Sequence, residues 1–248
     1  MTLARHMEHL LAKMSWPEVK SALERGTVAL LPVGSTEQHG PHLPVDNDHY
    51  TSYELSMLVA QQLEERFSIV VCPVVPFGIS PHHMDFPGTV SLRTQTFIDV
   101  VEDSIHSLLH HGFKHVVIIN GHGGNVSALG TVLIDMEREG FDNVFVVNWW
   151  EMAEGGIKET CRLPISHACE AETSIALALD QRVLMERARG VIVNETPAQK
   201  HRFPRIIELT DTGAMGEPEK ATREKGERIV EAGVKGICEF LEQVLKES

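Results

Sequence analysis

The feature that most constrains the fold of this chain is the regular alternation of apolar, strand-length runs with segments of helical period. Four continuous apolar runs have strand length: residues 27–33, 68–74, 115–120 and 143–148. Runs of this kind are typical of strands buried on both faces of a parallel sheet. Three segments between them repeat apolar side chains at three- and four-residue steps, which predicts helices: residues 49–66, 94–111 and 126–139. The alternation predicts an α/β fold with a mainly parallel central sheet and helices on both faces.

The second half of the chain is less regular. Residues 171–188 and 220–246 have helical spacing, and the second of these segments has one charged face. Residues 189–218 are richer in Pro, Thr and Gly and have no clear period, so we expect a long excursion over the surface with room for a short hairpin. No internal repeat or low-complexity linker divides the 248 residues, which predicts a single domain over residues 1–248.

The overall charge narrows the class of partner. The formal net charge is −13, which disfavours nucleic acid and anionic membrane as partners, because phosphate binding depends on Lys and Arg. The four cysteines form no CxxC pair, and no apolar stretch is long enough to span a membrane. The N-terminus has the pattern of a short amphipathic helix without the apolar core of a signal peptide. We therefore expect a cytoplasmic protein that acts on a small molecule.

Titratable side chains crowd the segment after the first apolar run: Glu37, His39, His42, Asp46, Asp48 and His49. Glu37 and His39 are two residues apart, so in an extended segment their side chains point the same way. Carboxylates combined with an imidazole suit Zn²⁺, Mn²⁺ or Fe²⁺, and a central Asp such as Asp48 can bridge two ions. A solvated polar loop is the alternative. It is the weaker one, because ligands of open parallel sheets bind at the carboxyl ends of strands.

The stretch NGHGGN (residues 120–125) follows the third apolar run and should lie near the first cluster. Its glycines permit close approach of a ligand to the backbone, and we expect Gly123 to contact the substrate. A Gly-rich loop before a helix can instead cradle a phosphate, but this one is neither GxGxxG nor a P-loop. His122 at its centre favours metal binding.

A third cluster lies in HACEAETS (residues 167–174), near a predicted helix start. Glu170 and Glu172 would interact well with the helix dipole, which is the simpler explanation for one of them. That explanation does not account for His167.

Together these motifs resemble a known family. GSTEQHGPHLPVDND, MDFPGTVSL, NGHGGN and HACEAETS, in this order and spacing, are similar to the creatininase (creatinine amidohydrolase) family, and TGAMGEPEKATREKGE resembles its C-terminal part. The resemblance covers most of the chain. It implies a three-layer α/β/α sandwich, two divalent metal ions per chain (Zn, Mn or Fe) and hydrolysis of C–N bonds in cyclic or linear amides. It also implies a homo-oligomer, often a hexamer.

The resemblance assigns the metal ligands residue by residue. Glu37, His39 and Asp48 match the first three ligands, with Asp48 as the bridge, and His122 matches the next. In creatininase itself the corresponding motif is NGHxEN, and its Glu is a metal ligand. This chain has Gly124 at the position of that Glu. The chain therefore resembles an NGHGGN-type subgroup, in which we predict that Glu170 completes the second metal site.

Other residues are assigned roles in catalysis or substrate binding. His167 matches the catalytic histidine, which would protonate the leaving nitrogen or steady the tetrahedral intermediate. Glu172 matches a Glu that both types keep, and it is predicted as a supporting partner of the site or an alternative ligand. His83, just before the MDFPGT stretch, is predicted to bind substrate, although exposed loop histidines at 82 and 83 would give the same pattern.

The expected activity is hydrolysis of a small cyclic amide or formamide by a hydroxide that bridges the two metal ions. Creatinine is disfavoured as the substrate. Creatininase has a Trp-Asp pair around its substrate at a position where this chain has RLPIS (residues 162–166). Alternatives are ring opening of a cyclic keto-inositol, peptide trimming on the same site, and a non-catalytic metal-binding subunit. The proposed ligands include no Cys and leave positions open for water, which favours an enzyme.

Four residues outside the assigned set are left with open alternatives. His42 and Asp46 flank the ligands, and Asp46 is more typical of a turn. Trp149 and Trp150 end the fourth apolar run and would either wall the pocket or pack in the core.

Overall fold

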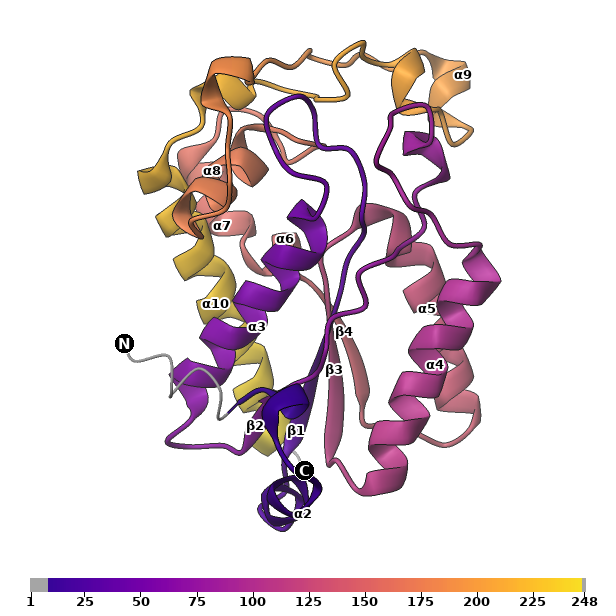
Figure 1. Cartoon of the computed structure of the whole chain (residues 1–248), viewed down its shortest axis with the longest axis vertical. Coiled ribbons are helices and arrows are strands. Elements are labelled where there is room, and N and C mark those ends of the chain that lie inside the picture. Colours follow the sequence, from indigo (N-terminus) through magenta and orange to yellow (C-terminus); the bar gives the residue numbers. More distant parts are fainter. Residues whose placement is uncertain (1–8, 247–248) are drawn as a thin grey trace.

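The computed structural model describes residues 9–246, which fold around a four-stranded parallel sheet (Figure 1). The strands are β1 (Val28–Val33), β2 (Ile69–Val71), β3 (His115–Asn120) and β4 (Val144–Asn148). Their order across the sheet is β2-β1-β3-β4, and all three pairings are parallel. The four strands coincide with the four apolar runs of the sequence. The second run is ordered as a strand only as far as Val71, shortly before Pro73, which cannot donate to a strand ladder.

Helices cover both faces of this sheet. One face carries α3 (Asn47–Leu63), α6 (Trp149–Met152), α7 (Glu154–Thr160), α8 (Glu170–Ala178) and α10 (Arg223–Lys246), and the other carries α4 (Thr94–His111) and α5 (Val126–Arg138). Figure 1 shows the sheet nearly edge-on between these two layers. The predicted α/β/α sandwich is therefore confirmed.

Alternate residues of the central strands divide the core between the two layers. Val28 and Leu30 of β1 pack with α3 and α10, whereas Ala29 and Leu31 pack with α4 and α5. Because side chains of a strand alternate between faces, both faces must be apolar, which explains the uninterrupted apolar runs.

The N-terminal and C-terminal regions differ from the sequence prediction in detail. The predicted N-terminal helix falls partly on residues 1–8, which lie outside the described range. The residues that follow form a 3-10 turn at Leu11–Lys13 and then α2 (Trp16–Leu23), where Ser15 and Glu18 make a capping box. The predicted C-terminal helix begins at Arg223, after a separate 3-10 turn at Pro218–Lys220.

The helix predicted over residues 171–188 is shorter than expected. It ends at Ala178, because Asp180 adopts a left-handed backbone (φ 57°) and the Gln181 N–H bonds back to the Ala176 carbonyl. The apolar residues beyond it belong to a separate 3-10 turn, Met185–Arg187.

Residues 189–218, here called the outer segment, cross the end of the molecule where the strands finish (orange in Figure 1). Their regular elements are α9 (Pro197–Lys200) and a 3-10 turn at Ile206–Glu208. No hairpin forms in this described stretch. Val191 and Met215 instead make an isolated parallel bridge, so the two ends of the outer segment lie side by side.

The sheet fixes where the polar loops meet. β1 and β3 are neighbours in register along their whole length, and Val33 pairs with Asn120 at their carboxyl ends. The loops that begin at Gly34 and Gly121 therefore leave the sheet next to each other. Gly121 allows the contact, since a Cβ there would overlap the Asp48 carbonyl oxygen. Within residues 9–246, none of the helices has the length and apolarity needed to cross a membrane.

Candidate metal centre

Buried polar side chains from three separate segments converge at the carboxyl ends of β1 and β3. Glu37 and His39 come from the loop after β1, Asp48 from the first turn of α3, and His122 from the loop after β3. These four side chains are all less than 5% exposed. Burial of so many ionisable groups is costly unless they are paired or bind ions.

Asp48 lies at the centre of this cluster. Its Oδ1 is 2.9 Å from His39 Nε2 and its Oδ2 is 3.0 Å from His122 Nδ1. One carboxylate thus faces two imidazoles that come from different loops. This is the arrangement expected of an Asp that bridges two cations.

In three histidines of the site, His39, His122 and His167, one ring nitrogen faces a backbone carbonyl. His39 Nδ1 lies 3.1 Å from the Glu37 carbonyl, His122 Nε2 lies 3.1 Å from the Ile79 carbonyl, and His167 Nε2 lies 2.8 Å from the Gln38 carbonyl. A carbonyl only accepts, so each of these nitrogens carries a proton and donates it. The other nitrogen of each ring is directed at the carboxylates. Histidine ligands of metals are oriented in the same way.

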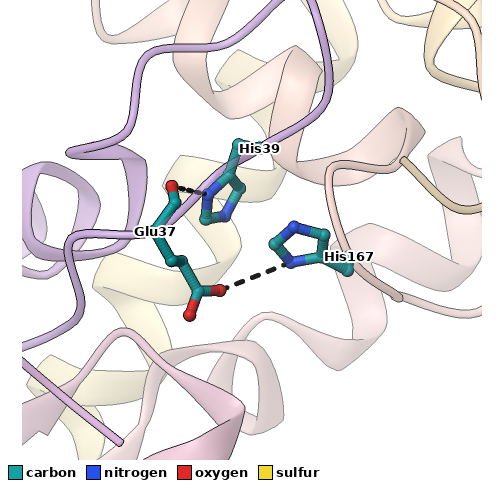
Figure 2. Close-up of side chains that lie close together, drawn as sticks. All are labelled: Glu37, His39 and His167. Carbon is teal, nitrogen blue, oxygen red and sulfur yellow. Dashed lines mark hydrogen bonds and ion pairs between the residues drawn. The ribbon is translucent and has the colours of Figure 1, made fainter. Parts of the chain in front are cut away.

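His167 also faces the cluster. Its Nδ1 is 3.5 Å from Glu37 Oε1, and Figure 2 shows Glu37, His39 and His167 turned toward one another. The His39 and His167 ring centroids are 4.3 Å apart. The following residue, Ala168, is fully buried in a left-handed conformation (φ 49°) that costs energy for any residue with a Cβ, so the surroundings impose this backbone on the loop.

Three sets of potential ligand atoms lie within 4.8 Å of one another: Glu37, Asp48 and His122; His39, Asp48 and Glu172; and Glu37, His39 and His167. The first two sets share Asp48, so two adjacent groups of side chains could each hold a cation. Neither carboxylate oxygen of Glu37 has a hydrogen-bond partner among the described residues, and the same holds for Glu172 Oε2. Buried carboxylate oxygens without hydrogen bonds fit a divalent ion, so these ligand atoms suit the predicted metal pair.

The electrostatics of the cluster support this interpretation. Burial lowers the pKa of an imidazole, but at His39 the attraction of Asp48, with smaller contributions from Glu172 and Glu37, outweighs this effect and raises the pKa to about 10. His122 is likewise raised to about 9, mainly by Glu37 and Asp48 against the effect of burial. Burial raises the pKa of Asp48, but His39 and His122 together hold it well below its usual range. Without cations, protons on the two histidines therefore balance the carboxylates, and cations would displace those protons.

Glu172 is the carboxylate that accompanies His39 and Asp48. Burial raises its pKa to about 7, and the opposing attraction of His39 only partly offsets this effect. It occupies the first turn of α8, two residues after Glu170, which the sequence favoured as a ligand.

Glu170, the predicted ligand of the second site, does not join the cluster. It is buried at the start of α8, but its carboxylate forms an ion pair with Lys225 of α10. Residues two apart on a helix point to different sides, so Glu170 and Glu172 cannot both face Asp48. The geometry gives that place to Glu172.

The other predicted residues are placed as follows. His83 and Gly123 both line the pocket beside the cluster. His83 is buried, its Nδ1 accepts a hydrogen bond from the Gln38 side-chain amide at 2.8 Å, and its Nε2 is 3.4 Å from Glu37 Oε1. His82 also lines the pocket, which contradicts the reading of both histidines as exposed loop residues.

Several neighbouring residues support the site without facing the cluster. His42 hydrogen-bonds Thr173 Oγ1 at 2.8 Å, and Asp46 accepts from the Gln181 amide at 3.0 Å. Trp149 is buried in the core and Trp150 lines the pocket, so each of the two alternatives for this pair holds for one residue.

Gln38, which contacts His83 and His167, was missed by the sequence analysis. Side chains alternate along an extended segment, so Gln38 was expected to point away from its neighbours Glu37 and His39.

Gly124 explains why no carboxylate enters from the loop after β3. A Cβ at this position would overlap both the Ile79 carbonyl and His122 Nε2. A glutamate here would disturb the hydrogen bond that orients His122, so this backbone requires the ligand to come from elsewhere. Glu172 is placed to supply it.

A pocket of about 410 Å³ opens beside the cluster. Its inner wall includes the Gly121–Gly124 loop and four carboxylate or imidazole side chains of the cluster: Glu37, Asp48, His122 and Glu172. Its outer wall comes mainly from the outer segment, with these residues: Glu195, Phe203, Pro204, Ile206, Leu209 and Met215. The sequence analysis did not identify them, since the segment has no periodic pattern that would indicate which side chains face inward.

The fold and the cluster define an α/β protein with a candidate dinuclear metal centre at the carboxyl edge of its sheet. The model of the Creatininase family (creatinine amidohydrolase) matches residues 12–241, and the chain belongs to this family.

Named relatives and a solved structure agree with this assignment. A mycofactocin precursor peptide peptidase of Mycolicibacterium smegmatis is 31% identical over 230 residues, covering 87% of this chain and 85% of the relative. A creatinine amidohydrolase of Pseudomonas putida is 29% identical over 257 residues, covering 94% and 96%. A solved structure described as "Creatininase Mn" superimposes with a TM-score of 0.82 at 26% identity, covering 95% of this chain and 98% of that one.

Proposed function

We propose that this protein is a hydrolase that uses two divalent metal ions to cleave an amide C–N bond. The observation that carries the proposal is the position of Asp48, which is shared by two sets of buried ligand atoms. Glu37 and His122 complete one set with Asp48, and His39 and Glu172 complete the other. When bound, two such ions acidify a water molecule and polarise the substrate carbonyl, and these ligands accept Zn, Mn or Fe.

His167 is the residue best placed to move a proton. Burial holds its pKa well below the usual range, so its imidazole is neutral at physiological pH. Its Nε2–H is held by the Gln38 carbonyl, which leaves Nδ1 free to accept a proton on the side of the cluster. A neutral imidazole so oriented can take a proton from the attacking water and deliver it to the leaving nitrogen.

The pocket restricts the class of substrate. Of the residues that the structure describes, no Lys or Arg lines it, whereas Glu37, Asp48, Glu172 and Glu195 do. Apart from the proposed metal ions, no lining group would supply a counter-charge to a phosphate or other strongly anionic group there. The proposal is therefore a formamide or other small amide without a phosphate. A peptide amide is the second candidate, favoured by the 31% identity to a precursor-peptide peptidase.

The direct test is metal analysis of the purified chain together with a hydrolysis screen over formamides, cyclic ureides, keto-inositols and short peptides. About two equivalents of Zn, Mn or Fe per chain and turnover that is lost on chelation and restored by the metal would support the proposal. His167→Gln is the matched control, since it should keep the metal and lose turnover. A chain that takes up no metal and hydrolyses none of these compounds when metal is supplied would overturn it.

A further inference from the structure

A second cavity adjoins the pocket of the candidate metal centre. Its volume is about 470 Å³, and two of its lining residues, Trp150 and Ile165, also line the first pocket. Ligand pockets for drug-sized molecules measure about 300–1,000 Å³, so each cavity alone reaches that range. Together they are larger than a compact cyclic amide requires.

The second cavity lies beside the first one, along the carboxyl ends of the strands. The metal centre lies over the ends of β1 and β3, whereas the second cavity is formed by α6 and α7, which follow β4, and by residues 161–165. Because β4 is the neighbour of β3, the two cavities lie in sequence along one edge. Ile165 is two residues before His167, so the loop that carries the histidine also forms part of the boundary between them.

The walls of the second cavity are mainly apolar and firmly held. Ile157 is buried, and Trp150, Cys161 and Ile165 pack against the core that α10 closes. The charged residues of its rim have partners: Lys158 pairs with Glu154 at 2.7 Å, and Arg162 lies 3.8 Å from Glu217. Glu151 accepts a hydrogen bond from the Asn148 amide. An uncharged, apolar group would suit this cavity better than a charged one.

We propose that this second cavity is a subsite for an apolar group of the substrate, which extends past Trp150 and Ile165 from the bond that is cleaved. The substrate is accordingly an elongated amide with an aliphatic or aromatic end. This inference rests on the proposed amide hydrolysis, but the subsite can be tested without turnover.

The kinetic test uses N-formyl-n-alkylamines of increasing chain length with the metal-loaded protein. For the wild type, kcat/KM should rise by about tenfold or more from the methyl to the hexyl compound, as apolar pockets discriminate methylene groups to this extent. Leu163 lines only the second cavity of the two, so Leu163→Asp should lower kcat/KM for the hexyl compound at least tenfold more than for the methyl compound. Leu133→Asp, a half-buried leucine on α5, is the matched control and should leave the length dependence intact.

Binding without turnover separates this inference from the proposed function. In the metal-loaded His167→Gln protein, which should not turn over amides, hexanamide should quench or shift tryptophan fluorescence at concentrations about tenfold lower than acetamide, and adding Trp150→Phe should abolish the signal. If the metal-supplied protein hydrolyses no compound of the screen described above while this difference holds, the proposed function fails and the subsite stands. Hydrolysis without any dependence on chain length, or a Leu163→Asp variant that behaves like Leu133→Asp, would overturn the subsite. A change in oligomeric mass with Leu163→Asp alone would also overturn it, because a second copy of the chain would then cover the cavity.

Discussion

The inner and outer walls of the pocket are built on different principles. The inner wall takes its side chains from loops that leave β1 and β3 side by side, and Glu37, Asp48 and His122 there are nearly inaccessible to solvent. The outer wall is a segment with little regular structure, and Phe203 is 62% exposed. Buried ionisable groups tolerate little change because each depends on the others, whereas an exposed apolar wall can be altered at low cost. Under the proposed function, the inner wall carries the chemistry and the outer wall carries the selectivity.

The largest effect is expected at the shared carboxylate of the inner wall. Asp48→Asn removes the charge that both ligand sets use, so we expect loss of both ions and a fall in turnover of more than about a thousandfold. Glu37→Gln, which alters one of those two sets, should retain more metal. Plasma mass spectrometry and a rate assay check this prediction. Equal metal loss in the two variants would mean that Asp48 is not shared.

Replacing His167, the proposed proton-transfer residue of the inner wall, should affect catalysis but not metal binding. His167→Gln is expected to lower kcat by about 10²- to 10⁴-fold, the usual contribution of general acid–base catalysis, while metal content stays near that of the wild type. His42→Gln, on a neighbouring histidine that faces Thr173, should have a smaller effect on kcat. A His167 variant with full turnover would remove the residue from the mechanism.

The charge balance of the inner wall predicts a measurable exchange of protons for metal. In the cation-free chain His39 and His122 have pKa values of about 10 and about 9, so both hold a second proton near neutral pH. Binding of stoichiometric Zn²⁺ at about pH 7 should release about two protons per chain from these histidines and a further fraction from Glu172, whose pKa is about 7, and metal should dissociate as pH falls. Titration with a pH indicator in weak buffer measures this release. His106→Gln, which changes a half-buried histidine on α4, should behave as wild type, and the absence of release would contradict the account.

Smaller effects are expected on the outer wall. Phe203 lines the pocket and contacts the His82 ring edge-on at 4.5 Å between centroids. Phe203→Ala should change KM, or the preference among amides, by about tenfold with little change in kcat, because Phe203 belongs to none of the three sets of potential metal ligands. Ile192→Ala, an exposed residue of the same segment outside the pocket lining, is the control. A large loss of kcat in Phe203→Ala would break the comparison between the walls.

The sequence predicted the parts of the molecule that local pattern determines. The strands and the helices on their two faces follow from period and apolarity. The meeting of Glu37, Asp48 and His122 follows from the rule that parallel strands end at the same edge. Motif order carried the family resemblance, while the catalytic role that it implies for His167 stays a prediction.

The sequence could not predict the parts that depend on tertiary geometry. Whether Glu170 or Glu172 faces Asp48 depends on how α8 is rotated, and Lys225, 55 residues further along the chain, draws Glu170 away. The end of α8 at Ala178 depends on one left-handed residue, Asp180. The outer wall has no period at all, so Phe203 and Met215 could not be identified as pocket residues from the sequence.

The most direct test of the account is the metal content of two matched variants, Glu172→Gln and Glu170→Gln, each loaded under the same conditions and measured by plasma mass spectrometry. The structure predicts that Glu172→Gln falls from about two ions per chain to about one, while Glu170→Gln stays near two. Retention of both ions by Glu172→Gln, with loss of one by Glu170→Gln, would contradict the proposed ligand set.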